Sequence, residues 1–324
     1  MTTTAVPGVS FRTLRDEADY QHMADILRAA HGADGIEWVI EAATLRVEHE
    51  HRADHDPRRD VVFAEVDGTP VAYGEALREM KGDVAVYYTG GKVRPEFRRR
   101  GIGRSLLRRS EARLREIAAH KADAGGRAFG SWILDNEGGA APLLLSEGYE
   151  AVRFGFGMRR PTLDDLPEVA LPDGLEVRPV RPQDHRAIFD ADNEAFRDSW
   201  GHGEATDEDF IAAYARPDLD TALWRVAWDG REVAGSVIVE IARMENETFG
   251  LRRGWLERVS VRRPWRRRGL ASALIVSALA GLRDAGMKDA MLGVDSENQT
   301  GALRLYESLG FIVRDHMTTY RKAW

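Results

Sequence analysis

The chain has 324 residues, a formal net charge of −7 and no cysteine. This length suits two domains of about 150–160 residues each, and the missing cysteine excludes disulfides, cysteine-ligated zinc and a cysteine-bound acyl intermediate. The sequence has no basic start followed by an apolar run, and no apolar stretch of roughly 20 residues, so we expect a cytoplasmic enzyme without a membrane partner. The acidic balance argues against nucleic acid as the main partner and favours a cationic substrate.

Hydrophobic periodicity predicts the same order of strands and helices twice along the chain. In the first half we expect strands at residues 9–14, 61–65, 71–76, 84–93, 127–134 and 149–158, and helices at 16–30, 102–120 and 137–147. In the second half we expect strands at residues 175–179, 223–228, 233–241, 255–261, 290–294 and 311–317, and helices at 183–195, 270–283 and 300–309. Residues 161–174 hold three prolines and four acidic residues, which is typical of a linker. The sequence therefore predicts a mixed α/β sheet that is built twice.

The clearest repeat is a basic segment that contains glycine. Residues 93–103 read V-R-P-E-F-R-R-R-G-I-G and residues 261–271 read V-R-R-P-W-R-R-R-G-L-A, with six of eleven positions identical. Each segment follows a predicted strand and opens a predicted helix, whose first N–H groups attract an anion, while arginine suits phosphate oxygens. A solvated arginine run or a nucleic-acid patch would not explain one loop repeated between the same elements. We therefore expect a pyrophosphate site, and not a nucleotide P-loop, because no G-K-S/T follows.

Arg266-Arg267-Arg268-Gly269-Leu270-Ala271 resembles the acetyl-CoA-binding loop of the GCN5-related N-acetyltransferases, written Q/R-x-x-G-x-G/A. The first loop matches this pattern as well, and residues 298–311, N-Q-T-G-A-L-R-L-Y-E-S-L-G-F, resemble a late signature of the same family. The resemblance covers nearly the whole chain. It implies two tandem domains of this family, each a mixed, mostly antiparallel sheet flanked by helices, at residues 1–160 and 175–324.

The resemblance also implies how acetyl-CoA, the co-substrate, would bind. Backbone amides around the second loop would hold the pyrophosphate, and pantetheine would enter between splayed strands at 255–261 and 290–294. No metal is expected. The residues expected to bind the cofactor are Val259, Val261, Arg266, Arg267, Arg268, Gly269, Leu270, Ala271, Ser272 and Asn298.

Two residues of the second half could move protons during acetyl transfer to an amine. Tyr306 occupies the position at which the family carries its general acid, and a phenol with a pKa near 10 stays protonated at neutral pH. Glu257 lies on the strand before the loop, where it could accept the amine proton directly or through water. The alternatives are that Tyr306 only packs its ring and that Glu257 only faces solvent. Strand alternation places Glu257 on one face of its strand with three other residues, Trp255, Val259 and Val261. Three further residues are reserve candidates for the base: Asp295, Glu297 and His202.

The first half keeps the loop but not these two residues. Thr89 stands where the second copy has Glu257, and Leu144 stands where it has Tyr306. Arg98, Gly101 and Gly103 are retained, so residues 1–160 either bind CoA without turnover or only shape the substrate cleft. A third possibility is that this half uses other residues, such as Tyr87 or Tyr88, in place of these two.

The sequence leaves the acceptor and the oligomeric state open. The prediction is transfer of acetyl to a small-molecule primary amine by direct attack in a ternary complex, with the C-terminal domain active. The tandem layout also resembles the mycothiol synthases, which acetylate the cysteinyl amine of a glycoside, although residues 197–203, R-D-S-W-G-H-G, depart from that pattern. A non-catalytic protein that senses CoA is a further alternative. Helical regions at 16–50 and 183–214 are expected to form the acceptor wall.

Overall fold

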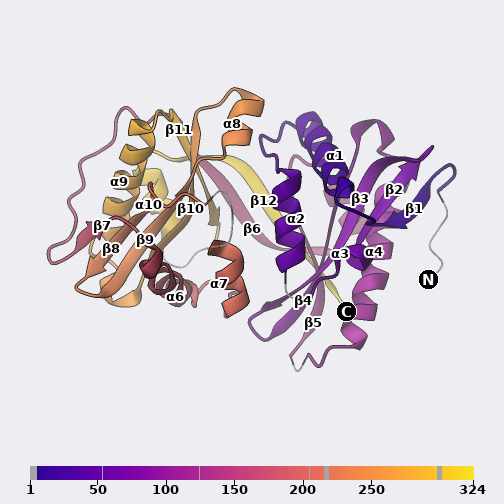
Figure 1. The fold of residues 1–324 in the computed structure, drawn as a ribbon, viewed down its shortest axis with the longest axis horizontal. Helices are drawn as coiled ribbons and strands as arrows, with labels where there is room; N and C mark the ends of the chain where they lie inside the picture. Colours follow the sequence, from indigo (N-terminus) through magenta and orange to yellow (C-terminus); the bar gives the residue numbers. More distant parts are fainter. Residues whose placement is uncertain (1–5, 53, 124, 204, 215–218, 298–300) are drawn as a thin grey trace. The chain divides into compact units, whose positions relative to one another are not determined.

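The computed structural model describes residues 6–52, 54–123, 125–203, 205–214, 219–297 and 301–324. The chain forms two compact units (Figure 1). Unit 1 consists of Met1–Arg153 together with Met317–Trp324, and unit 2 consists of Phe154–His316. Each unit has its own run of hydrogen-bonded strands and its own buried core, in agreement with the predicted duplication.

Unit 1 holds most of the elements of the first half of the chain. Its strands are β1 (Ser10–Thr13), β2 (Val61–Val66), β3 (Thr69–Lys81), β4 (Val84–Val93), β5 (Arg127–Leu134) and the end of β12 (Ile312–Ala323). Its helices are α1 (Ala18–Asp34), α2 (Ala42–His51), α3 (Pro57–Asp60), α4 (Ile102–Ala119) and α5 (Ala140–Ser146), with a 3₁₀ turn at Pro95–Phe97. The strand order is β1-β2-β3-β4-β5-β12, and every pair in it is antiparallel except β4 with β5.

Unit 2 repeats this plan. Its strands are β7 (Glu176–Arg178), β8 (Arg225–Asp229), β9 (Glu232–Glu240), β10 (Arg253–Val261), β11 (Asp289–Asp295) and most of β6 (Glu150–Arg160). Its helices are α6 (His185–Phe196), α7 (Asp207–Tyr214), α8 (Arg243–Phe249), α9 (Leu270–Asp284) and α10 (Ala302–Ser308), with 3₁₀ turns at Pro182–Asp184 and Arg263–Trp265. The strand order is β7-β8-β9-β10-β11-β6, and β10 with β11 is the parallel pair.

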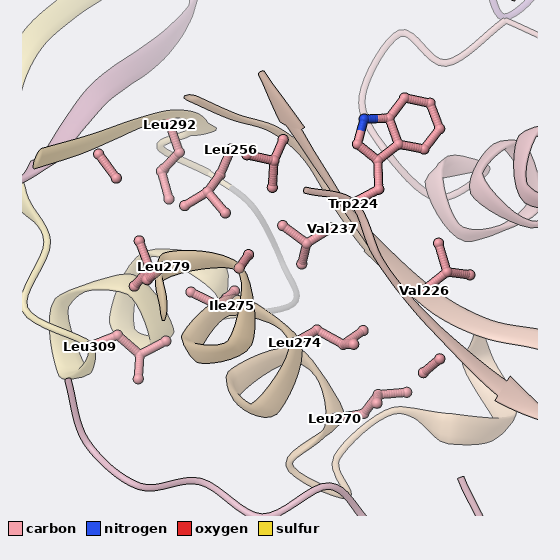
Figure 2. Packing of buried hydrophobic residues seen from close by; sticks show 14 of the residues in the cluster. Trp224, Val226, Val237, Leu256, Leu270, Leu274, Ile275, Leu279, Leu292 and Leu309 are labelled. Atoms are coloured by element: carbon pink, nitrogen blue, oxygen red, sulfur yellow. The ribbon is translucent and has the colours of Figure 1, made fainter. Parts of the chain in front are cut away.

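Helix α9 covers one face of the sheet of unit 2. Leu270 and Leu274 are one helical turn apart and fully buried, as the predicted i, i+4 pattern requires. Figure 2 shows side chains of α9 pointing toward the sheet, where Val237, Leu256 and Leu292 extend from three adjacent strands. Side chains of this kind each stabilise the fold by roughly 1.5–3 kcal/mol when fully buried. This packing holds the start of α9, and the loop before it, against the central strands.

The last strand of each sheet comes from the other half of the sequence. Strand β6 pairs with β11 through Gly155–Arg160, and β12 pairs with β5 through Met317–Ala323. The compact units therefore differ from the predicted division after residue 160. Both halves predict a final strand after their last helix, and a duplicated chain offers each of these strands two equivalent sheet edges. Periodicity along the sequence cannot choose between those edges.

The remaining predicted strands and helices are confirmed, with shifts of a few residues at their ends. Helix α8, between β9 and β10, was not predicted, because its seven residues are too few to develop a helical period. Among the described residues, no helix combines the length and apolar character needed to cross a membrane.

Candidate active site

The two central strands of unit 2 diverge at a defined point. The parallel pairing of β10 with β11 runs from Arg253 opposite Asp289 to Leu256 opposite Leu292. Beyond that pair, β10 continues to Val261 and β11 continues to Asp295. We call the point after Leu256 and Leu292 the fork of unit 2. The splayed central strands implied by the family resemblance are thus confirmed.

A β-bulge lies directly at the fork. On the other side of β10, Leu256 is opposite Val239 of β9 and Arg258 is opposite Ile238, so Glu257 is the extra residue of the bulge. A bulge leaves its extra residue outside the ladder and shifts the alternation of side chains by one. The prediction that one face holds Trp255, Glu257, Val259 and Val261 is therefore wrong. Trp255 and Arg258 share one face, and Leu256, Val259 and Val261 share the other.

The loop after β10 has the shape that an anion site requires. Arg267 and Gly269 have φ angles of 60° and 83°, both in the left-handed region. Helix α9 begins at Leu270, and the N–H of Ala273 makes the first helical hydrogen bond, to the carbonyl of Gly269 at 3.1 Å. The N–H groups of Leu270, Ala271 and Ser272 precede that bond, so they form the positive end of the helix dipole.

The loop of unit 1 repeats this geometry. Arg99 and Gly101 have φ angles of 63° and 84°, and the N–H of Ser105 donates to the carbonyl of Gly101 at 3.0 Å. Gly103 lies in the first turn of α4, where an added Cβ would contact Leu143 Cδ2 at 3.4 Å. The backbone of the two loops is therefore the same, although their first halves differ in sequence.

The first arginine of each loop binds the protein itself. In unit 2, Arg266 Nε donates to the carbonyl of Val261 at 2.9 Å, Arg266 Nη2 donates to the carbonyl of Ala195 at 2.8 Å, and Arg266 Nη1 lies 3.2 Å from Asp198 Oδ2. These three contacts tie the loop to β10 and to the end of α6. The charge near the loop therefore comes from Arg267 and Arg268, which are exposed.

Arg98 makes the equivalent contacts in unit 1. Its guanidinium donates to the carbonyls of Val93 and Ala30, each at 3.2 Å, and forms two hydrogen bonds to Asp34, at 2.6 and 2.9 Å. We call this arrangement of arginine, two carbonyls and aspartate the loop clamp. Its presence in both units means that the first arginine is explained by the fold alone.

Tyr306 is buried in the core of unit 2. It lies on α10, is 6% exposed, and meets the ring of Phe311 edge-on with 6.0 Å between ring centroids. Burial raises the pKa of Tyr306 to about 12. The phenol therefore keeps its proton at neutral pH and can donate it. Leu144, at the equivalent place on α5, is also buried but has no proton to donate.

Glu257 is exposed, while a second carboxylate that the sequence did not single out is buried close to it. Glu245 on α8 is 5% exposed and accepts a hydrogen bond from Trp255 Nε1 at 3.0 Å. Burial, reinforced by the charges of Glu257 and Glu240, raises the pKa of Glu245 to about 7, although Trp255 and Arg253 oppose the shift. A carboxyl group with this pKa can exchange a proton near neutral pH. In the sequence, Glu245 is only one glutamate in a short segment for which no helix or strand was predicted.

The face of β10 that carries Arg258 holds a buried polar network under α6. Asp192 on α6 accepts from Ser236 Oγ at 3.3 Å and forms an ion pair with Arg258. Ser236 Oγ lies 3.1 Å from Ser260 Oγ, which joins β9 to β10. The charge of Arg258 next to Glu257 is thus neutralised within unit 2.

The remaining candidates lie on β10, at the end of β11, in loops or outside the described residues. Val259 and Val261 are half-buried at the edge of the core. Asp295 ends β11 and accepts from the N–H of Glu297 at 3.0 Å, while His202 follows α6 in an irregular segment. Asn298 lies outside the described residues. In unit 1, Tyr87 donates to Asp123 at 2.5 Å and Tyr88 accepts from Arg321 at 3.1 Å.

Across the described parts of the chain, no cluster of histidine and carboxylate side chains has the arrangement of a metal site.

The chain matches known acetyltransferases in both halves. The model of the acetyltransferase (GNAT) family matches residues 21–126 and again residues 185–311. Among curated proteins, the chain is 32% identical to a mycothiol acetyltransferase of Geodermatophilus obscurus over 328 aligned positions, covering 99% of each chain. It is 31% identical to a mycothiol acetyltransferase of Salinispora arenicola, covering 96% of each chain.

Solved structures give the same result for the fold. A GCN5-related N-acetyltransferase from Sphaerobacter thermophilus has a TM-score of 0.75 and 28% identity, with 98% of this chain and 96% of that chain covered. A tandem GNAT protein from the clavulanic acid biosynthesis pathway has a TM-score of 0.67 at 16% identity, with 97% and 98% covered. The tandem arrangement predicted from the sequence is confirmed.

Proposed function

Because the chain belongs to the acetyltransferase (GNAT) family and is an acetyltransferase of this type, we propose that unit 2 moves an acetyl group from acetyl-CoA to a primary amine. One observation carries this proposal: the fork of β10 and β11, the anion-shaped loop at Gly269 and the protonated phenol of Tyr306 all belong to the same unit. Unit 1 has a loop of the same shape, but Leu144 replaces the phenol.

Two places in unit 2 support the binding of acetyl-CoA. The N–H groups of Leu270, Ala271 and Ser272 would hold the pyrophosphate, because they lack helical partners and lie at the positive end of α9. The diverging ends of β10 and β11 would receive the pantetheine arm, because backbone groups beyond the fork are not used in the β10–β11 ladder. Acetyl-CoA supplies the thioester that carries the acetyl group.

The residues of unit 2 then serve the transfer itself. The neutral amine attacks the thioester carbonyl, a C–N bond forms, and the C–S bond breaks. Tyr306 donates its proton to the departing thiolate, and a carboxylate of the β10 region accepts the proton lost by the amine nitrogen. Glu257 is the acceptor predicted from the sequence, and its charge helps to raise the pKa of the neighbouring Glu245. Positioning in a ternary complex supplies most of the rate, and proton transfer adds roughly 10²–10⁴-fold.

The first acceptor to test is the cysteinyl amine of a glycoside. The curated relatives that match the whole length of this chain are mycothiol acetyltransferases, and a net charge of −7 suits a cationic amine. Residues 197–203 depart from the pattern expected for those proteins, so simple primary amines belong in the same panel. A protein that binds CoA without turnover is the second candidate, and it predicts binding with no acetylated product.

The test is acetyl transfer from acetyl-CoA to a panel of primary amines that includes a cysteinyl glycoside. Product should be detected by mass, because a thiol reagent would also react with the cysteinyl acceptor. We expect one amine class to gain an acetyl group, and we expect Tyr306→Phe to abolish most of that gain while still binding CoA. Tight CoA binding with no product from any amine would favour the non-catalytic alternative.

A further inference from the structure

Unit 1 has a fork at the same place as unit 2. The parallel pairing of β4 with β5 runs from Ala85 opposite Arg127 to Tyr88 opposite Gly130, while the two strands continue to Val93 and Leu134. The first residues beyond the pairing are therefore Thr89 and Ser131. The internal repeat aligns Tyr88 with Leu256 and Gly130 with Leu292, so Thr89 corresponds to Glu257 and Ser131 corresponds to Gly293.

Side chains connect the diverging strands of unit 1. Ser131 Oγ donates to the carbonyl of Thr89 at 3.0 Å, directly across the fork, and Ser131 is 6% exposed. Further along, Lys92 Nζ on β4 lies 2.5 Å from Oε2 of Glu137, which follows β5. The side chains of Lys92 and Glu137 are 17% and 8% exposed, so this ion pair is shielded from water. We call these two contacts the fork ties.

At the two described positions of unit 2 that correspond to Ser131 and Lys92, no side chain joins β10 to β11 in this way. Gly293 has no side chain, and a Cβ built on it would meet no described atom within 4 Å. Ser260, at the position of Lys92, bonds instead to Ser236 on β9, the strand on the other side of β10. Strand β10 also bulges at Glu257, whereas β4 pairs with β3 residue by residue from Val84 to Val93.

We propose that the fork ties close unit 1 to the pantetheine arm, and that Gly293 is the residue that leaves the fork of unit 2 open, so that each chain binds one molecule of acetyl-CoA. This inference rests on the proposed function of unit 2. An occupant of the unit 1 fork would have to break a buried ion pair and take the carbonyl of Thr89 from Ser131. Removing one partner of a buried hydrogen bond or ion pair is costly, so the ties oppose entry. The loop at Gly101 would then face no bound pyrophosphate.

The first experiment measures how many CoA molecules bind per chain, by isothermal titration of the full-length protein with CoA. We expect one site, which disappears in Gly269→Glu and persists in Gly101→Glu. Two sites, or one site that persists in Gly269→Glu and disappears in Gly101→Glu, would overturn the inference and leave the chemistry of the family intact. No binding at all would overturn the proposed function, and the inference with it.

The second experiment transfers a tie from unit 1 to unit 2. Gly293→Ser places a hydroxyl at the position that corresponds to Ser131, and Gly293→Ala adds the same Cβ without the hydroxyl. Because the Cβ has open space, both variants should fold, which a thermal melt would verify. We expect CoA to bind about fivefold to tenfold more weakly to the serine variant than to the alanine variant, as the loss of one hydrogen-bonded carbonyl predicts. Equal affinities in the two folded variants would contradict the assignment of Gly293.

Discussion

The two units share their loop and differ at their fork. Arg99 and Gly101 have the same left-handed backbone as Arg267 and Gly269, and each loop is held by its own clamp. At the fork, by contrast, unit 1 has side-chain ties and unit 2 has a bulge and Gly293. The loop can persist in both units because its first arginine also fastens the loop to the fold. A loop that matches the family pattern is therefore weaker evidence for CoA binding than an open gap between the two strands beside it.

The largest difference between the units should come from adding negative charge to each loop. Gly269→Glu puts a carboxylate beside the expected pyrophosphate, and like charges about 4 Å apart near a surface repel by roughly 4 kcal/mol. We expect the apparent KM for acetyl-CoA to rise on the order of a hundredfold or more. Steady-state kinetics at several acetyl-CoA concentrations would measure it.

Gly101→Glu is the matched control for this change. The φ angles of Gly101 and Gly269 are 84° and 83°, so both substitutions impose the same left-handed strain, of about 1–2 kcal/mol. Only the unit 2 variant should lose activity. An equal loss in both variants, with both still folded, would mean that the loops act together and that the units are not divided as proposed.

The next largest effect should come from Tyr306. Tyr306→Phe keeps the ring that packs against Phe311 and removes only the proton donor, so kcat should fall roughly 10²–10⁴-fold with little change in melting temperature. The matched change in unit 1, Leu144→Met, alters a buried side chain at the equivalent place and should leave kcat unchanged. Turnover of the phenylalanine variant within a factor of two of the parent would make Tyr306 a packing residue.

The role of Glu257 in proton transfer should be visible in the pH dependence of kcat. Glu257→Gln should lower kcat, and the loss should shrink at high pH, where the amine deprotonates without help. A smaller loss that does not depend on pH would remove Glu257 from the proton path. Rate profiles of the parent and the variant between pH 6 and about 9 would decide, since a general base is effective above its own pKa.

Glu245 should affect stability in a defined pH window. Its pKa is raised to about 7 in the folded protein, so folding favours the protonated form. Between about pH 4.5 and 7 the unfolded chain loses this proton while the folded protein keeps it, so stability falls across this window and is level above about pH 7. Relative to the parent, Glu245→Gln should gain melting temperature as the pH rises from about 4.5 to about 7, with no further gain above that. Glu232→Gln, an exposed glutamate whose charge is not among the causes of the shift of Glu245, serves as control, and equal pH dependence in the two variants would contradict burial of Glu245 as the cause.

The sequence predicted the parts of this molecule that depend on local patterns. Alternation and the i, i+4 spacing of leucines gave β10 and α9, and the repeat located both loops. The bulge at Glu257 was missed because it depends on the register between β9 and β10, which no single strand encodes. The exchange of β6 and β12 was missed for the same reason, since it concerns which sheet edge a strand joins. Glu245 was missed because its raised pKa comes from burial by residues distant in sequence, not from its own segment.

The smallest predicted effect concerns the loop clamps. A lysine side chain can keep the ion pair to aspartate, but it lacks the planar guanidinium whose other N–H groups donate to the two carbonyls. Arg98→Lys and Arg266→Lys should therefore each cost about 1 kcal/mol of stability, measured by chemical denaturation. Because only unit 2 is proposed to hold CoA, Arg266→Lys should also raise the KM for acetyl-CoA several-fold, whereas Arg98→Lys should not. If Arg98→Lys weakened CoA binding as much as Arg266→Lys, the unit 1 loop would be in contact with the cofactor and the comparison of the two forks would fail.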